Sequence, residues 1–346
     1  MEKRILLISS RSDIGGGPQH VRDLIHGCKR IGARVFVASP KIAPYGKIFQ
    51  ELSDGHFEIP HRKLSFIRLL KLAKFIKANQ IQIIHSHGRG AGAYSRLLSV
   101  LDVKVFHSFH GFHHSKTLLG KLKNFIDRLL SYRTDRLFFV STSEYQTALK
   151  YNIHIEEKSK VIPNGLQLSP PTKEAKKGEF KSIGILSRFD PHKNILRSLE
   201  LFAELLKHSP LVHLNIAGDG EQKEEIEEKV KSLNIVNNVT FYGFTSEPLS
   251  FLKEQDVYLS TSLGEGLPYT ALQAMSVNTI PLVSHVSGHI DILDAPYLFN
   301  LDDRHDFINK FNNLQSGIQH HFQAQLEKDY DINKQIKKVV DTYYEN

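Results

Sequence analysis

The strongest constraint on the fold is a repeated alternation of short apolar runs with longer amphipathic ones. Residues 4–10 (RILLISS) are apolar enough for a strand buried on both faces of a parallel sheet. A glycine-rich turn at 15–18 (GGGP) and a helical pattern from Pro18 to about Ile31 follow, and 34–39 (RVFVAS) repeat the strand pattern. This order predicts a parallel βαβ unit that opens on a glycine-rich turn.

The alternation runs on, stops and restarts. Further strands are expected at 81–85, 104–109, 136–141 and 161–162, with helices at 66–78, 118–132 and 144–151. Residues 166–180 lack apolar periodicity and carry two prolines and several charges, which is typical of a linker. Strands then follow at 182–187, 212–217, 239–242, 256–260 and 279–284, with helices at 195–207, 221–232, 246–254 and around 272–276. The last stretch, 305–346, has a helical pattern.

Two such alternations predict an α/β protein with two doubly wound, Rossmann-like domains. We place an N-terminal domain at 1–165, a linker at 166–180 and a C-terminal domain at 181–325. A helix is expected over 326–346, and its crossing back to the N-terminal domain is left open. Ligands bind at the carboxyl ends of strands in such sheets, so the chemistry is expected in a cleft between two facing domains.

Composition and charge limit the compartment and the partners that we expect for this chain. The 346 residues suffice for two domains, and the single cysteine, Cys28, excludes an intramolecular disulfide and is expected to be a buried thiol. The apolar run 5–8 is too short for a signal peptide, and no stretch approaches ~20 apolar residues, so a cytoplasmic protein is expected. The net charge of +8 favours phosphates or an anionic membrane as partners, because no nucleic-acid module is present.

The turn at Gly15–Gly17 could bring a ligand close to the backbone and to a helix N-terminus. It lacks the third glycine of a dinucleotide fingerprint, and the next strand ends in Ser39-Pro40 without an acidic residue for a ribose. A nicotinamide site is therefore disfavoured, and a purely structural turn explains the glycines equally well.

Two cations follow the strand at 182–187. Arg188 and Lys193 are five residues apart at a carboxyl end, where both could neutralise a diphosphate leaving group. Ordinary solvated surface charge is the alternative.

A carboxylate lies on a glycine-flanked loop, Gly264–Pro268, and the expected helix that holds Leu272–Ser276 begins after this loop. Glu265 could bind sugar hydroxyls, and the amides at the helix start could take a phosphate. Gln273 follows eight residues on, which places it about two turns into that helix. As a lone residue, Glu265 could equally be an ordinary loop acid.

Six histidines gather in the N-terminal half: His85, His87, His107, His110, His113 and His114. Their spacing matches no metal-binding signature, so most are expected to be ordinary polar residues near the cleft. His110 is the best functional candidate, because it stands at a strand's carboxyl end just before a loop.

Two basic helical segments, 62–77 and 116–133, mix Leu, Ile and Phe with Lys and Arg. Such helices can lie on an anionic membrane. Packing of the apolar side chains into the domain is the preferred alternative.

Together these residues resemble glycosyltransferase family 4, the retaining GT-B enzymes. The resemblance runs from about Ile5 to Leu293 and rests on short motifs in the family's order. They are Gly16-Gly17, His85-Ser-His-Gly88, Phe109-His-Gly-Phe112, Val140-Ser141, Val161-Ile-Pro-Asn-Gly165, Arg188 with Lys193-Asn194, Ile216-Ala-Gly-Asp-Gly220, and Glu265-Gly-Leu-Pro268 with Ala274-Met275. Each motif is weak alone, and the ordered set is specific.

The resemblance implies a role for each site residue. The residues assigned to the nucleotide-sugar donor are Gly16, Gly17, Arg188, Lys193, Gly266, Leu267 and Gln273. Catalysis is assigned to Glu265, which would grip the sugar hydroxyls from the face opposite the acceptor, and to His110, beside the transferred sugar. His87 falls on the acceptor side, in the acceptor-binding N-terminal domain. The family usually has a second glutamate where this chain has Gln273, which puts donor affinity in doubt.

The implied activity is retaining transfer of a hexosyl or N-acetylhexosaminyl group from a nucleotide-diphosphate sugar, with UDP as the expected nucleotide. The acceptor would be a glycan or lipid-linked saccharide in lipopolysaccharide or capsule synthesis, met at the inner face of the plasma membrane. No metal or cofactor is expected, since Arg188 and Lys193 can do a cation's work. A nucleotide-sugar 2-epimerase and a non-catalytic GT-B partner protein stay open as alternatives.

Overall fold

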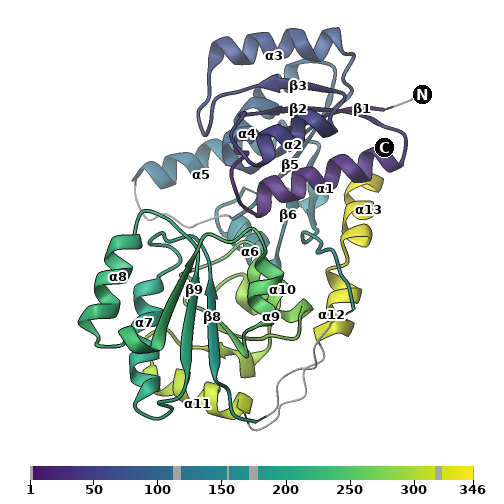
Figure 1. Ribbon diagram of the computed structural model, residues 1–346. Helices are drawn as coiled ribbons and strands as arrows, with labels where there is room; N and C mark the ends of the chain where they lie inside the picture. The colour runs from purple at the N-terminus through teal and green to yellow at the C-terminus, as the bar shows by residue number, and fades with distance from the viewer. Residues whose placement is uncertain (1–2, 112–117, 154–155, 171–177, 316–321, 346) are drawn as a thin grey trace. The chain divides into compact units, whose positions relative to one another are not determined.

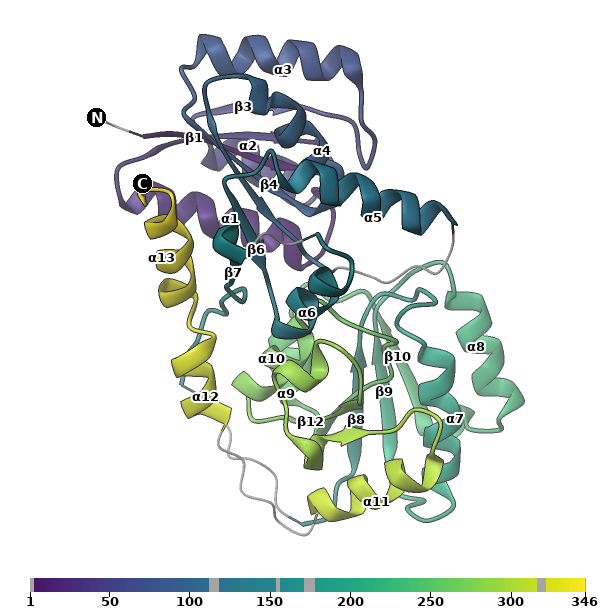
Figure 2. The same ribbon diagram turned by 180° about the vertical axis from the view of Figure 1, so that it is seen from behind.

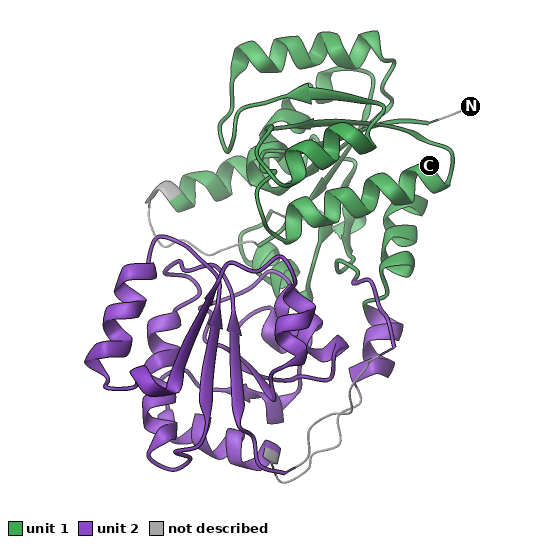
Figure 3. Ribbon diagram, viewed as in Figure 1, with its two compact units in different colours: residues 1–165, 330–346 green, residues 166–329 purple. Residues whose placement is uncertain are grey.

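The computed structural model describes residues 3–111, 118–153, 156–170, 178–315 and 322–345. The chain forms two compact units (Figure 3). Unit 1 comprises residues 1–165 and 330–346, and unit 2 comprises residues 166–329. Part of the expected linker, residues 171–177, lies outside the described residues.

Unit 1 contains a seven-stranded parallel sheet in the order β3-β2-β1-β4-β5-β6-β7 (Figure 1). The strands are β1 (Arg4–Ser9), β2 (Arg34–Ser39), β3 (Gly55–Glu58), β4 (Ile83–His87), β5 (Lys104–Ser108), β6 (Arg136–Phe139) and β7 (Ser159–Val161). The helices are α1 (Gly16–Arg30), α2 (Tyr45–Leu52), α3 (Phe66–Ala78), α4 (Gly88–Leu97), α5 (Leu118–Ser131), α6 (Thr142–Lys150) and α13 (Ile332–Thr342).

Helices cover both faces of this sheet (Figures 1 and 2). Helices α1, α2 and α13 share one apolar cluster with the sheet, and α3 and α4 share another on the opposite face, where α5 packs beside α4. Burial on both faces explains why β1 and β2 read as continuous apolar runs.

The C-terminal segment forms two helices, which corrects the single helix expected over 326–346. Helix α12 (Phe322–Asp329) ends just before Tyr330, and Asp331 caps α13 by accepting a hydrogen bond from the Lys334 amide at 2.9 Å. Helix α13 then packs on α1, where Ile336 lies directly over Gly27. Beyond it, the buried Tyr343 contacts Phe106 with ring centroids 5.0 Å apart, so α13 belongs to the core of unit 1.

Helix α4 is the largest element of unit 1 that the sequence analysis did not predict. Its sequence, GRGAGAYSRL, has three glycines and a low intrinsic helix propensity. The structure explains two of them: a Cβ at Gly90 would lie 2.6 Å from Ser10 Oγ, and one at Gly92 would lie 2.6 Å from His107 Cε1. Glycine is needed here because the helix approaches its neighbours closely, and tertiary packing outweighs propensity.

Unit 2 contains a six-stranded parallel sheet in the order β10-β9-β8-β11-β12-β13. The strands are β8 (Ser182–Leu186), β9 (His213–Ala217), β10 (Val239–Gly243), β11 (Val257–Ser260), β12 (Ile280–Ser284) and β13 (Leu298–Phe299). Its helices are α7 (Ile195–Leu206), α8 (Lys223–Ser232), α9 (Pro248–Lys253), α10 (Tyr269–Ser276), α11 (Arg304–Gln315) and α12. Single 3₁₀ turns occur at Leu98–Val100, Glu156–Lys158, Val236–Asn238, His289–Asp291 and Ala295–Tyr297.

The contact of α1 with α13 gives a stability prediction. A Cβ at Gly27 would overlap Cγ2 of Ile336, and the β-branched isoleucine has little rotamer freedom in a helix. We expect Gly27→Ala to lower the free energy of unfolding by roughly 1–3 kcal/mol, although alanine is the better helix former. Urea unfolding followed by circular dichroism measures this. In an Ile336→Ala background the same change should cost nothing; an equal loss in both backgrounds would contradict the packing explanation.

Candidate functional site

The strand order of unit 1 reverses between β1 and β4, and polar residues collect at the carboxyl ends around this point. Gly16 and Gly17 begin α1 after β1, His87 is the last residue of β4, and His110 follows β5 by two residues. A reversal of strand order is where open α/β sheets hold their ligands. The sheet thus collects four of the residues singled out from the sequence.

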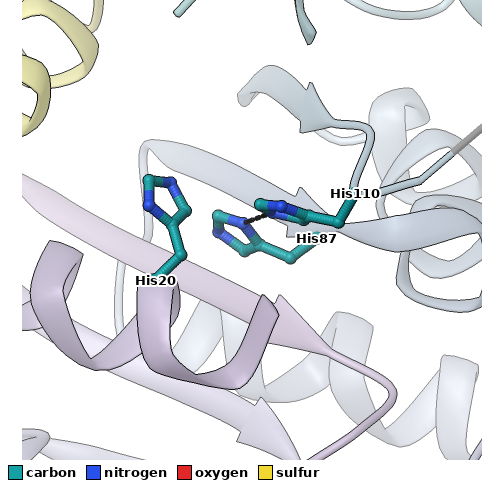
Figure 4. A group of neighbouring side chains, drawn as sticks. All are labelled: His20, His87 and His110. Atoms are coloured by element: carbon teal, nitrogen blue, oxygen red, sulfur yellow. Dashed lines mark hydrogen bonds between the residues drawn. The ribbon is translucent and has the colours of Figure 1, made fainter. Parts of the chain in front are cut away.

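Three histidine rings meet there (Figure 4). Nδ1 of His87 lies 3.1 Å from Nε2 of His110, and these two rings stack with centroids 5.4 Å apart. His20, on the first turns of α1, approaches both rings at 5.5 and 5.3 Å. A Cβ at Gly17 would lie 4.0 Å from His110 Cγ, so the glycine turn adjoins the cluster.

The three imidazoles are neutral near pH 7. Burial, and then the neighbouring histidines, hold the pKa values of His20 and His87 well below their usual range. Burial alone lowers the pKa of His110 to about 4. Neutral imidazoles can both donate and accept hydrogen bonds. Within the described part of the chain, Nε2 of His87 and Nδ1 of His110 are buried without a hydrogen-bond partner, so each nitrogen could bind a ligand.

This cluster could also hold a metal ion. One ring nitrogen from each of His20, His87 and His110 lies within 4.8 Å of the others, and three neutral histidines are a known zinc ligand set. The lack of a metal requirement, expected from the sequence, therefore stays a prediction.

The other histidines of the N-terminal half differ in position. His85 is hydrogen-bonded to Ser108 Oγ at 2.8 Å and to the Tyr343 hydroxyl, and His107 is hydrogen-bonded to Ser86 Oγ at 2.9 Å. Both are fully buried within unit 1, as polar parts of its core. His113 and His114 lie outside the described residues.

The strand order of unit 2 reverses between β8 and β11, and a charged pair lies there. Lys193 follows β8 and Glu265 follows β11, and Lys193 Nζ lies 2.6 Å from Glu265 Oε1. Burial opposes ionisation of Glu265, but the Lys193 ammonium and a hydrogen bond from Ser262 prevail and lower its pKa. Glu265 is therefore a carboxylate near pH 7, held beside a cation.

Arg188 lies in a different setting from Lys193. It is half exposed and pairs with Asp190 at 3.0 Å, while the other Asp190 oxygen accepts the amides of His192 and Lys193 at 3.1 and 3.2 Å. The sequence analysis gave Asp190 no role. The structure makes it the residue that shapes the turn from Arg188 to Lys193.

Glu265 is supported from behind by the segment after β12. Its amide donates to the Ser287 carbonyl at 2.9 Å, and a Cβ at Gly288 would lie 2.5 Å from the Glu265 carbonyl oxygen. Gly288 also has a φ of +84°, which favours glycine. The buried His289 donates from Nδ1 to the Ser284 carbonyl at 2.8 Å, and burial lowers its pKa to about 4. The sequence analysis missed His289, since its distance from Glu265 along the chain hides their proximity.

The remaining donor candidates lie around the start of α10. Gly266 and Leu267 precede it, and the Tyr269 amide donates to the Leu267 carbonyl at 2.9 Å. Gln273 is the fifth residue of α10, just over one turn in, which corrects the expected two turns. Its backbone carbonyl accepts from Ser276 Oγ at 2.8 Å.

Family models match both halves of the chain. The model described as Glycosyltransferase Family 4 matches residues 14–169, and the model described as Glycosyl transferases group 1 matches residues 170–314. The chain belongs to glycosyltransferase family 4. The family resemblance read from the sequence is thereby confirmed, and the chain is a glycosyltransferase.

Individual relatives support the same assignment. The chain is 26% identical over 298 residues to the O-antigen biosynthesis glycosyltransferase WbnH of Escherichia coli, covering 85% of this chain and 84% of the relative. It is 24% identical over 313 residues to the E. coli UDP-Gal:alpha-D-GlcNAc-diphosphoundecaprenol alpha-1,3-galactosyltransferase, covering 82% and 81%.

The fold also has close neighbours. The crystal structure of Anabaena HepE with UDP and glucose superposes with a TM-score of 0.84 at 15% identity, covering 99% of this chain and all of the neighbour. At that identity the likeness speaks for the fold, and the expected GT-B fold with two Rossmann-like domains is confirmed.

The neutral histidine cluster makes unit 1 sensitive to acid. His110 has a pKa of about 4 in the folded chain, against 6.5 without burial. Between these values the unfolded chain binds a proton that the folded chain does not, so the free energy of unfolding falls as the pH falls from 6.5 towards 4. We predict that the urea midpoint decreases through this window and decreases less in His110→Asn. Equal slopes for the two proteins would show that His110 does not titrate as described.

Proposed function

We propose that this family 4 enzyme is a retaining transferase that moves a hexosyl or N-acetylhexosaminyl group from a UDP-sugar to a lipid-linked saccharide. The observation that carries the proposal is the Lys193–Glu265 pair at the strand-order reversal of unit 2. It provides a cation for the diphosphate and a carboxylate for the sugar in one place. The names of the relatives support surface-polysaccharide synthesis as the process and an undecaprenol diphosphate saccharide as the acceptor class.

Unit 2 holds the donor in this proposal. Lys193 binds the diphosphate, and Arg188, half exposed and held by Asp190, approaches the same phosphates from solvent. Once Lys193 contacts phosphate, Glu265 is free to accept hydrogen bonds from sugar hydroxyls. Gly266 and Leu267 contribute amides, and Gln273 accepts from the ribose.

In the same proposal, unit 1 binds the acceptor and also contacts the sugar of the donor. The amides of Gly16 and Gly17 contact the donor, and His110 contacts the transferred sugar through Nδ1, which has no hydrogen-bond partner among the described residues. His87 lies on the acceptor side. A neutral cluster fits these roles, because charged imidazoles would repel the cationic character that develops at the anomeric carbon.

The chemical step is a substitution at the anomeric carbon. The acceptor hydroxyl oxygen bonds to that carbon on the face from which the diphosphate oxygen departs, so the configuration is retained. The hydroxyl proton passes to the departing phosphate oxygen. Lys193 and Arg188 neutralise the diphosphate, which removes the need for a divalent metal ion.

The direct test measures nucleotide release from a panel of UDP- and GDP-sugars, with a chelator present and with or without an undecaprenol diphosphate saccharide. Acceptor-dependent release from one preferred donor is the expected result. Donor conversion without any acceptor would favour the 2-epimerase, and binding without turnover would favour the non-catalytic partner. Activity that needs an added divalent ion would overturn the metal-free mechanism and direct attention to His20, His87 and His110.

The role of Glu265 gives the sharpest substitution. We expect Glu265→Ala to lower kcat at least about a hundredfold, because a carboxylate that contacts the reacting sugar is lost. Steady-state kinetics and circular dichroism measure activity and fold together. Glu228→Ala, at an exposed acid on α8, is the matched control and should keep full activity. Normal turnover by Glu265→Ala would sink the assignment.

Gln273 tests the donor side separately. We expect Gln273→Glu to lower the KM for the donor roughly threefold to tenfold, since a charged acceptor binds the ribose hydroxyls more strongly than an amide. The kcat should change little. A KM that is unchanged or higher would mean that Gln273 does not touch the ribose in this way.

A further inference from the structure

Helix α5 buries polar side chains and exposes apolar ones, which is the reverse of the usual pattern. Among its described side chains, the polar Asn124, Asp127 and Ser131 are buried at 5% exposure or less. Four apolar residues lie on the opposite side and are 45–55% exposed: Leu122, Phe125, Ile126 and Leu129. Their i, i+3, i+4 and i+7 spacing forms one continuous stripe. A helix that only packs against its own domain would bury this stripe.

A buried polar seam holds α5 in this orientation. Asp127 pairs with Arg96, which is fully buried, at 3.1 Å and with Arg89 at 2.8 Å. Arg89 also donates to Asn124 Oδ1 at 2.6 Å, and Ser131 donates to the Ile153 carbonyl at 2.6 Å. Turning the helix over would leave these buried charges without partners, so the outward apolar stripe is specified rather than incidental.

The start of α3 shows a second exposed apolar group. Phe66, Ile67 and Leu70 are 69–70% exposed, and the exposed lysines Lys71 and Lys74 follow. Helices α3 and α5 belong to the same helical layer of unit 1. The Tyr94 hydroxyl of α4 accepts from the Ser65 amide at 2.8 Å, and the buried polar side chains hold α5 against α4.

The part of the sequence that contains these helices is strongly basic. Between Glu58 and Asp135 the sequence has fourteen lysines and arginines and two acidic residues, Asp102 and Asp127. Asp127 is buried in the seam, so the exposed charged residues on the described part of α5 are Lys121, Lys123 and Arg128. Apolar side chains ringed by cations complement a surface with negative headgroups over hydrocarbon.

We propose that the α3/α5 surface, defined by Phe66, Ile67, Leu70, Leu122, Phe125, Ile126 and Leu129, docks on an anionic lipid bilayer. The apolar side chains enter the headgroup region, and the surrounding lysines and arginines contact the lipid phosphates. No helix in the described part of the chain is long and apolar enough to cross a membrane, so this is attachment from one side. This proposal rests on the proposed function only for the role of the attachment, which would give the enzyme access to a lipid-linked acceptor.

The test is sedimentation of the full chain with vesicles of phosphatidylglycerol and phosphatidylcholine, without donor or acceptor. Strong binding to the mixed vesicles, and weak binding to pure phosphatidylcholine or at high salt, is expected. A variant with Leu122→Gln, Phe125→Gln, Ile126→Gln and Leu129→Gln should bind at least about tenfold more weakly. Glutamine suits a helix, and these side chains lie outside the seam, so the fold should persist.

Matched controls keep the result interpretable. Leu211→Gln with Val236→Gln removes apolar residues that are 73% and 55% exposed in unit 2, and this variant should bind vesicles normally. A separate variant with Phe66→Gln, Ile67→Gln and Leu70→Gln tests the α3 half if the α5 variant fails to fold.

Three results would overturn the proposal: vesicle binding that all these variants retain, no binding by the unmodified chain, or a dimer in light scattering that the α5 substitutions abolish. The last would make a second copy the occupant. Vesicle binding is read without turnover, so failure of the transferase assignment would leave this measurement intact. Transfer to a water-soluble acceptor by the α5 variant should match that of the unmodified chain.

Discussion

In a parallel sheet that helices cover on both faces, polar side chains can reach a ligand only at the ends of the strands. Both units obey this constraint, and in both the polar groups gather where the strand order reverses, between β1 and β4 and between β8 and β11. The central strands β4, β11 and β12 are buried along their whole length, whereas the edge strands β3, β7 and β10 are partly exposed. The positions of Gly17, His110, Lys193 and Glu265 follow from this topology.

The two reversal points are built on opposite electrostatic principles. Unit 1 presents imidazoles that burial keeps neutral, whereas unit 2 presents a carboxylate kept ionised by a lysine. Each environment is stabilised by its own neighbours: His87 contacts His110, and Lys193 contacts Glu265. In the proposed reaction, Lys193 would meet the leaving diphosphate, Glu265 the sugar hydroxyls, and the neutral His110 the transferred sugar.

The sequence predicted what local pattern determines. The alternation of apolar runs was enough for two Rossmann-like domains, and position at a strand end was enough to single out His110 and Lys193. Prediction from the sequence failed where tertiary packing outweighs the local sequence pattern. No helix was expected at α4, whose glycines give it a low helix propensity, and Gly92 is accommodated because the helix approaches His107 closely. His20 and His289 were missed because only the folded chain brings them beside His110 and Glu265. The inverted face of α5 was equally hidden, since periodicity shows that a helix has two faces and not which one is buried.

Tyr343 gives unit 1 a core drawn from both ends of the chain, with its hydroxyl on His85 and its ring against Phe106. A ribosome therefore finishes unit 2 before it makes the last piece of unit 1. Until α13 emerges, the side of α1 around Gly27 and Cys28 has no cover. The half that is synthesised first is thus the half that is completed last.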